Sequence, residues 1–209
     1  MRHRFTGLVA LAAASLAVPA GAEGQSAPRD TGLILSTPEA AIASPVRRYK
    51  DMSLLVDLSD RTLFVLSEGE VVRRFPVSVG QEGYSTPPGT YRIGHMIWNP
   101  RWVPPNSSWA REHHAEPPGS PGNPMGRVKM FFREPDLYIH GTALPSSLGR
   151  ARSHGCVRMR NTDAVELARI VMVNAGEPKT PEWFQQTIEK ADTSREVQLP
   201  RPMRVRVRQ

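Results

Sequence analysis

The amino-acid sequence predicts a mostly β protein, a β-sandwich or small barrel-like fold with a few short helices. Short runs rich in β-branched and aromatic residues recur from residue 53 onward, and turn-forming residues separate them. Helical patterns are confined to three short segments, at residues 38–43, from residue 161 and at residues 181–190. The chain is long enough for one ordinary domain with appendages.

Residues 1–22 have the pattern of an export signal. Arg2 and Arg4 precede an apolar run from Gly7 to Val18, and Ala20-Gly21-Ala22 supplies the small residues of a cleavage site. The run is shorter than the roughly 20 apolar residues that span a bilayer. Cleavage is therefore favoured over a retained anchor, and we expect an exported protein of the periplasm or cell wall.

Residues 23–50 are rich in Ala, Ser, Pro and Thr and have no sustained period, so we expect a flexible linker with a short helical pattern at Pro38 to Ala43. A catalytic domain is expected over residues 51–176. Residues 177–209 are expected to form a C-terminal helix and strand that pack on that domain.

The first half of the expected domain consists of four strands. They are predicted at residues 53–58, 62–67, 71–79 and 89–98. The turns between them are short, as at Ser59-Asp60-Arg61, which favours an antiparallel sheet or small barrel.

Residues 99–126 break this regularity. The segment is rich in proline and glycine, which exclude a regular strand or helix, and it contains Trp102 and Trp109. Long ordered loops often bind ligands or cover sites. Because large aromatic side chains usually pack against other groups, we expect a folded cap rather than a flexible insertion.

The second half of the domain alternates strands with polar connections. Strands are predicted at residues 128–132, 137–140 and 157–159, with a polar connection at residues 143–152. A helix begins near Asn161, with Asn161 or Thr162 as its N-cap. Its apolar stripe should bury against the sheet and consists of Ala164, Leu167, Ala168 and Val171.

The C-terminal tail combines a helix-like segment, residues 181–190, with an alternating segment, residues 201–208. In the second segment Met203, Val205 and Val207 alternate with arginines, which is typical of a strand with one charged face. The alternative interpretation is a basic tail that binds cell-wall polymers.

Cys156 is the single cysteine of the sequence. An unpaired cysteine in an exported protein suggests a reactive thiol, although a buried inert thiol is the alternative. A thiol attacks carbonyls as thiolate and needs a base, and His140 and His154 both precede it. Gly155 allows a sharp turn in which backbone N–H groups could converge on an oxyanion.

The flanking residues carry a family resemblance. Ile139-His140-Gly141-Thr142, followed by Ser153-His154-Gly155-Cys156-Val157-Arg158-Met159, resembles the signature of the L,D-transpeptidases, the YkuD-type catalytic domains. Three upstream segments are also similar to that family: Trp98-Asn99-Pro100, Pro118-Gly119 and Gly122-Asn123-Pro124-Met125-Gly126. The resemblance covers roughly residues 50 to 175.

The resemblance implies roles for the site residues. Cys156 would be the nucleophile and His140 its base, with the carbonyl of Gly141 orienting the imidazole. His154, Gly155 and Ser153 would shape the cysteine turn and the oxyanion hole. Arg158 would hold a substrate carboxylate or brace the turn, and a surface ion pair is the alternative. The other expected substrate-binding residues are Asn123, Gly126 and Tyr138.

The resemblance also implies the reaction. Cys156 would attack a peptidoglycan stem tetrapeptide, release D-alanine and form a thioester. An acceptor amine would then give a 3→3 cross-link or attach a protein to the wall, and water would make the protein an L,D-carboxypeptidase. Carbapenems are the implied inhibitors. A non-catalytic peptidoglycan-binding module and an unrelated exported thiol hydrolase remain as alternatives.

Charge and histidine content limit the other partners. The formal charge of +7 suits anionic cell-wall polymers or membrane surfaces, whereas the export signal argues against nucleic acid. His113 and His114 are adjacent and make a poor ligand pair, and His95 lies in a predicted strand. We expect no metal and no cofactor.

Overall fold

The computed structural model describes residue 1, residues 37–43 and residues 45–209. The predicted export signal, residues 1–22, and most of the predicted linker, residues 23–50, lie outside the described residues. The fold is mostly β with few helices, as predicted. No helix in the described part of the chain is long and apolar enough to cross a membrane.

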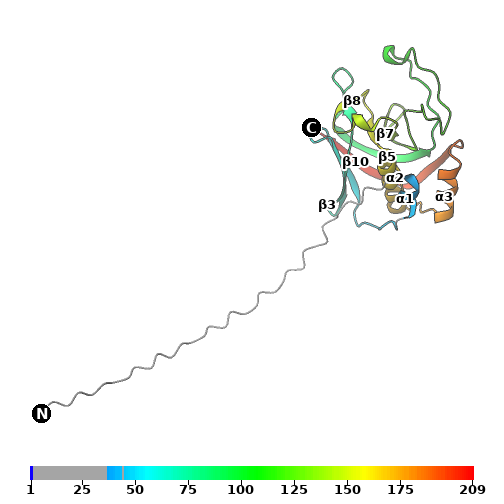
Figure 1. Cartoon of the computed structure of the whole chain (residues 1–209). Coiled ribbons are helices and arrows are strands. Elements are labelled where there is room, and N and C mark those ends of the chain that lie inside the picture. Colours follow the sequence, from blue (N-terminus) through cyan, green and yellow to red (C-terminus); the bar gives the residue numbers. More distant parts are fainter. Residues whose placement is uncertain (2–36, 44) are drawn as a thin grey trace. The chain divides into compact units, whose positions relative to one another are not determined.

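One mixed sheet of eight strands organises the molecule (Figure 1). In spatial order its strands are β3 (Glu70–Pro76), β2 (Thr62–Ser67), β1 (Ser53–Asp57), β10 (Arg195–Arg208), β5 (Gly89–Trp98), β6 (Val128–Arg133), β7 (Leu137–Thr142) and β9 (Val157–Arg160). The pairs β1–β10 and β7–β9 are parallel and the others antiparallel. A second, two-stranded sheet pairs β4 (Val79–Gly80) with β8 (Ala151–Ser153).

The C-terminal strand β10 lies inside the sheet, between β1 and β5. It begins at Arg195, six residues before the predicted start at Arg201. The sequence hides this first part because Pro200 and Pro202 interrupt the strand pattern, and the register with β5 shifts between Gln198 and Met203. Since Val205 and Val207 are buried in the core, this segment is a strand of the domain, and binding of its exposed arginines to wall polymers stays a prediction.

Two further sequence expectations are corrected. The strand predicted over residues 71–79 ends at Pro76, and Val79 pairs instead with Ala151 of β8. After β3, at one edge of the large sheet, the chain reaches β9 at the other edge, where the backbone of Ser78 pairs with Arg158 through hydrogen bonds of 2.8 and 2.9 Å. The predicted polar connection at residues 143–152 therefore contains the start of a strand and a short 3-10 helix, Pro145–Ser147.

Helix α2 (Asn161–Ala175) packs against one face of the sheet. The predicted apolar stripe, Ala164, Leu167, Ala168 and Val171, is fully buried. The predicted cap is wrong, because the N-cap residue is Arg160 and no side chain caps this end. Asn161 Oδ1 instead accepts a hydrogen bond from the backbone N–H of Arg127 at 3.1 Å.

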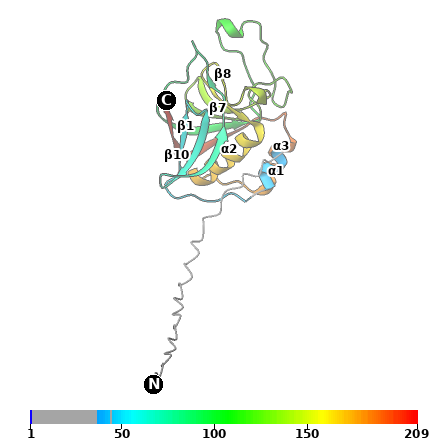
Figure 2. The same cartoon turned by 60° about the vertical axis from the view of Figure 1, so that its left-hand side comes forward.

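Two short helices lie beside α2, as Figure 2 shows: α1 (Pro38–Ala43) and α3 (Pro181–Glu189). α1 covers the residues predicted for it, and its Ala41 is fully buried and accepts a hydrogen bond from the Arg169 guanidinium. This part of the predicted linker is thus packed on the domain. In α3, Thr180 caps the helix by accepting from Trp183 N–H at 3.3 Å.

Candidate active site

Several of the predicted site residues lie together on the sheet face opposite α2. Side chains alternate between the two faces of a strand. His140 of β7 is in register with Arg158 of β9 and with Lys129 of β6, so these three side chains share one face. The intervening positions Ile139 and Val157 are fully buried in the core on the α2 side. Tyr138 and Cys156, each two residues earlier, lie on the site face.

A hydrogen-bonded turn presents Cys156 at the start of β9. Ser153 Oγ donates to the Cys156 carbonyl at 2.5 Å and accepts from the Gly155 N–H at 3.2 Å. Gly155 has φ +107, a region that favours glycine, and its carbonyl accepts from Thr86 Oγ1 at 2.8 Å. The Gly155 N–H is hydrogen-bonded inside the turn. This bond supports the expected role of Gly155 in shaping the turn more than its expected role in an oxyanion hole.

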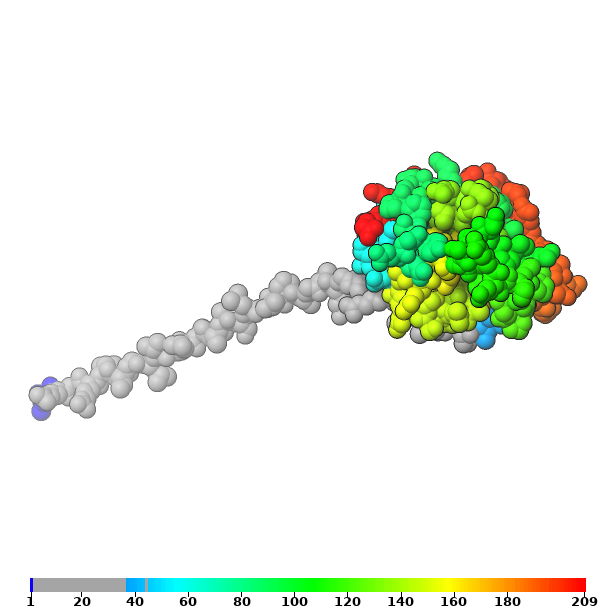
Figure 3. Space-filling model, turned by 90° about the horizontal axis from the view of Figure 1, so that it is seen from above, coloured from blue at the N-terminus to red at the C-terminus, as the bar shows by residue number. Residues whose placement is uncertain are grey.

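His154 joins the turn to the segment of residues 99–126. Its imidazole stacks on Trp109, with ring centroids 3.9 Å apart, and contacts the edge of Tyr84 at 4.7 Å. Burial lowers the pKa of His154, and the positive charge of Arg158 lowers it further. Trp102 is buried and pairs with Glu116, so the segment is a folded cap beside the turn (Figure 3).

The Cys156 thiol is free and donates to the carbonyl of Asp136 at 3.3 Å. Burial raises its pKa to about 11, although hydrogen bonds with Tyr138 and the positive charges of Arg158 and Lys129 oppose the rise. Burial likewise raises the pKa of Tyr138, and the negative charge of the thiolate adds to it. At neutral pH both groups therefore hold their protons.

The His140 imidazole is buried and neutral. Burial lowers its pKa to about 3, and the positive charge of Arg158 lowers it further, while backbone hydrogen bonds with Gly141 and Pro124 raise it. Nδ1 has no hydrogen-bond partner among the described residues. A neutral imidazole with an unpartnered nitrogen can accept a proton.

Asn161 fixes the backbone behind His140. A Cβ atom on Gly141 or on Gly126 would overlap Asn161 Oδ1, so both glycines allow a close approach. The same oxygen accepts from the N–H of Arg127, which follows Gly126. Gly126 therefore packs behind the site, which accounts for a glycine at this position, and the substrate contact expected of it stays a prediction. Sequence reasoning assigned Asn161 only to helix capping and missed this contact.

Asn123 is buried, and its amide is fully engaged in the loop. Nδ2 donates to the carbonyls of Pro100 at 2.8 Å and Pro117 at 3.0 Å, and Oδ1 accepts from Met125 N–H at 2.9 Å. These hydrogen bonds support a role of Asn123 in holding the cap segment together more than the expected contact with substrate.

Two cations of the site face, Arg158 and Lys129, have no carboxylate partner among the described residues. Arg158 makes no ion pair within residues 37–43 and 45–209, so the alternative of a surface ion pair finds no support there. Lys129 lies over the rings of Phe131 and Tyr138, with Nζ 4.5 and 4.8 Å from their centroids. Sequence reasoning missed Lys129, whose only signal was a charge at a position facing away from the core.

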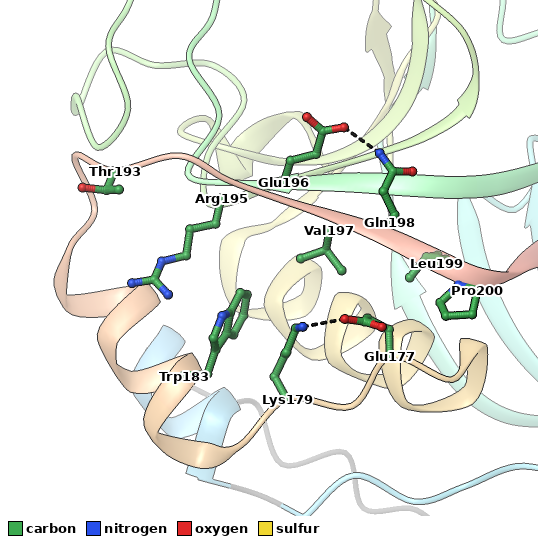
Figure 4. A pocket seen from close by; sticks show the side chains of 10 residues that line it. All are labelled: Glu177, Lys179, Trp183, Thr193, Arg195, Glu196, Val197, Gln198, Leu199 and Pro200. Atoms are coloured by element: carbon green, nitrogen blue, oxygen red, sulfur yellow. Dashed lines mark hydrogen bonds and ion pairs between the residues drawn. The ribbon is translucent and has the colours of Figure 1, made fainter.

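His95 lies beside a carboxylate, and one cavity is lined by residues other than those predicted for the site. His95 Nδ1 is 2.9 Å from Glu134 Oε1, and among the described residues no three His, Cys, Asp or Glu side chains form a cluster that could hold a metal ion. A cavity of about 630 Å³ lies between α3 and β10 and is lined by Lys179, Trp183 and Arg195, among others (Figure 4). None of the predicted site residues lines it.

Known proteins resemble this chain in sequence. The protein named "Putative L,D-transpeptidase YkuD" from Bacillus licheniformis is 34% identical over 118 residues, covering 56% of this chain and 59% of that protein. The Escherichia coli K12 protein named "Probable L,D-transpeptidase YbiS" is 29% identical over 181 residues, covering 82% of this chain. The chain thus spans less than two thirds of the length of these relatives, 59% and 57%.

A solved structure of an L,D-transpeptidase from Mycobacterium smegmatis is 16% identical, with a TM-score of 0.49 over 76% of this chain and 59% of that chain. The model of the L,D-transpeptidase catalytic domain (YkuD) matches residues 51–188, which is more than half of the chain. On this match, the chain belongs to the L,D-transpeptidase catalytic domain (YkuD) family.

Proposed function

We propose that this protein is a cysteine-dependent acyltransferase that acts on peptidoglycan stem tetrapeptides. The observation that carries the proposal is the shared sheet face of Tyr138, His140, Cys156 and Arg158, where a free thiol and a neutral imidazole with an unpartnered Nδ1 lie on adjacent parallel strands. Membership of the family supports the substrate class.

In the first half-reaction His140 acts as general base. Both groups are neutral at rest, so Nδ1 takes the Sγ proton as sulfur attacks the carbonyl carbon of the third stem residue. The hydrogen bond with the Gly141 backbone orients the ring. The tetrahedral intermediate then collapses, the imidazolium returns its proton to the leaving amine, and D-alanine departs from the thioester.

In the second half-reaction an acceptor amine gives its proton to His140 and displaces the Cys156 thiol. An amine of another stem peptide gives a 3→3 cross-link, and an amine of a protein gives a wall attachment. Both reactions place the enzyme in the periplasm or cell wall after export. Carbapenems would acylate the same sulfur.

The test is mass spectrometry of stem tetrapeptides incubated with the purified protein and with the Cys156→Ala variant. We expect D-alanine release and cross-linked dimers that depend on Cys156. Release of D-alanine without dimers would assign the L,D-carboxypeptidase activity. Unchanged peptides together with retained peptide binding would replace the proposal by a binding module.

A further inference from the structure

Lys129 is a cation of this face that has no part in the proposed half-reactions. Its side chain is half-buried, and Nζ lies against the rings of Phe131 and Tyr138. The nearby carboxylate of Glu134 is engaged with His95 at 2.9 Å. Within the described ranges no ion pair involves Lys129, although a partly buried ammonium gains stability from an anionic partner.

Arg158 and Lys129 lie on either side of His140. The register places the three residues in one row across β6, β7 and β9. Adjacent strands are about 4.8 Å apart, so the backbones of Lys129 and Arg158, with one strand between them, are about 10 Å from each other. The positive charges of both residues favour an anion at Cys156.

We propose that Lys129, together with Arg158, selects donor peptides that carry a free carboxylate close to the carbonyl attacked by Cys156. This inference rests on the proposed function for the identity of the donor. Lys129 is a specificity-determining residue here, since a carboxylate would gain a charge-assisted hydrogen bond that the corresponding primary amide cannot match. A hydrogen bond to a charged group corresponds to roughly a tenfold to hundredfold preference.

The first test requires no transpeptidation. Cys156 is alkylated with iodoacetate, an anion, and with neutral iodoacetamide, and the modified protein is quantified by mass spectrometry. In Lys129→Met we expect the iodoacetate rate to fall about tenfold relative to the iodoacetamide rate. Lys129→Arg should keep the preference for the anion, and raising the salt concentration should weaken it.

The matched control is Lys50→Met, which removes an exposed lysine paired with Glu68 and should leave both alkylation rates unchanged. An equal fall with both reagents in Lys129→Met would show that Lys129 acts on the thiol alone and would overturn the proposal. An unchanged ratio would overturn it as well.

The second test uses stem tetrapeptides that differ only in amidation, at the diamino acid in one series and at the terminal alanine in the other. We expect Lys129→Met to raise KM about tenfold for the free acid with little change in kcat, and to leave the amide unaffected. The series that responds identifies the carboxylate. Equal KM changes for acid and amide would contradict the inference. Failure of every peptide to react, with the iodoacetate preference intact, would reject the proposed function and leave the anion site standing.

Discussion

The cations on this sheet face have carboxylate partners at one end of the sheet and none among the described residues at the other. At the β1–β10 end, Arg208 Nε binds Asp57 Oδ2 at 2.8 Å and Arg204 binds Asp51 Oδ1 at 3.1 Å. At the β6–β9 end, Lys129 and Arg158 lie on either side of His140 without a carboxylate partner among the described residues. Paired charges hold strands together, whereas unpaired, partly buried charges are suited to an incoming anion.

The largest expected effect concerns the chemistry of the unpaired end. His140→Gln removes the proposed base and should slow acyl-enzyme formation about 10²–10⁴-fold, and Cys156→Ala should abolish it. The mass shift of the protein after incubation with a carbapenem measures the adduct. If His140→Gln were acylated at the native rate, His140 would not be the base.

A second prediction concerns the pH dependence of Cys156 alkylation at the end of the sheet with unpaired cations. Because the pKa of Cys156 is raised to about 11, the thiolate fraction should rise about tenfold per pH unit below that value. Alkylation by iodoacetamide should therefore accelerate roughly 100-fold between about pH 7 and 9. A plateau in the alkylation rate below pH 9 would mean that the positive charges of Lys129 and Arg158 lower the pKa of Cys156 by more than burial raises it.

A third prediction tests the backbone behind the site. Gly126→Ala places a methyl group against Asn161 Oδ1 at a φ of +63 and should lower the free energy of unfolding by about 2–4 kcal/mol. Gly69→Ala is the matched control, with φ +87 and open space around it, and should cost about 1 kcal/mol. Urea denaturation measures both. Equal losses would show that backbone conformation alone matters at Gly126.

The smallest effect concerns the paired end. Asp57 is buried, and the N–H of Asp60 together with Arg208 lowers its pKa, so its contribution to stability is present above about pH 4 and is lost as pH falls further. Asp57→Asn should cost about 1–2 kcal/mol at pH 7 and less at pH 3. Lys129→Met should cost less than Asp57→Asn at pH 7. Urea denaturation measures both costs. A larger loss of stability in Lys129→Met than in Asp57→Asn would contradict the contrast between paired and unpaired cations.

Local patterns in the sequence were sufficient for several elements. Runs of β-forming residues between turn residues predicted β2 and β5 with their observed bounds, and the apolar stripe of α2 is buried as expected. The pairing of His140 with Cys156 as candidate base and nucleophile came from the motif alone and stays a prediction. The sequence did not predict the hydrogen-bond partner of the Cys156 thiol. That partner is the backbone carbonyl of Asp136, and any residue type can supply a backbone carbonyl.

The sequence by itself determined the mostly β class, the cysteine turn and the family, because these depend on alternation and on residues close together in the chain. Only the tertiary structure decided that β10 is an interior strand, that Asn161 supports Gly126 and Gly141, and that Lys129 stands in register with His140. The physical reason is that strand order and register depend on backbone pairing between distant segments, which side-chain patterns within each segment do not encode.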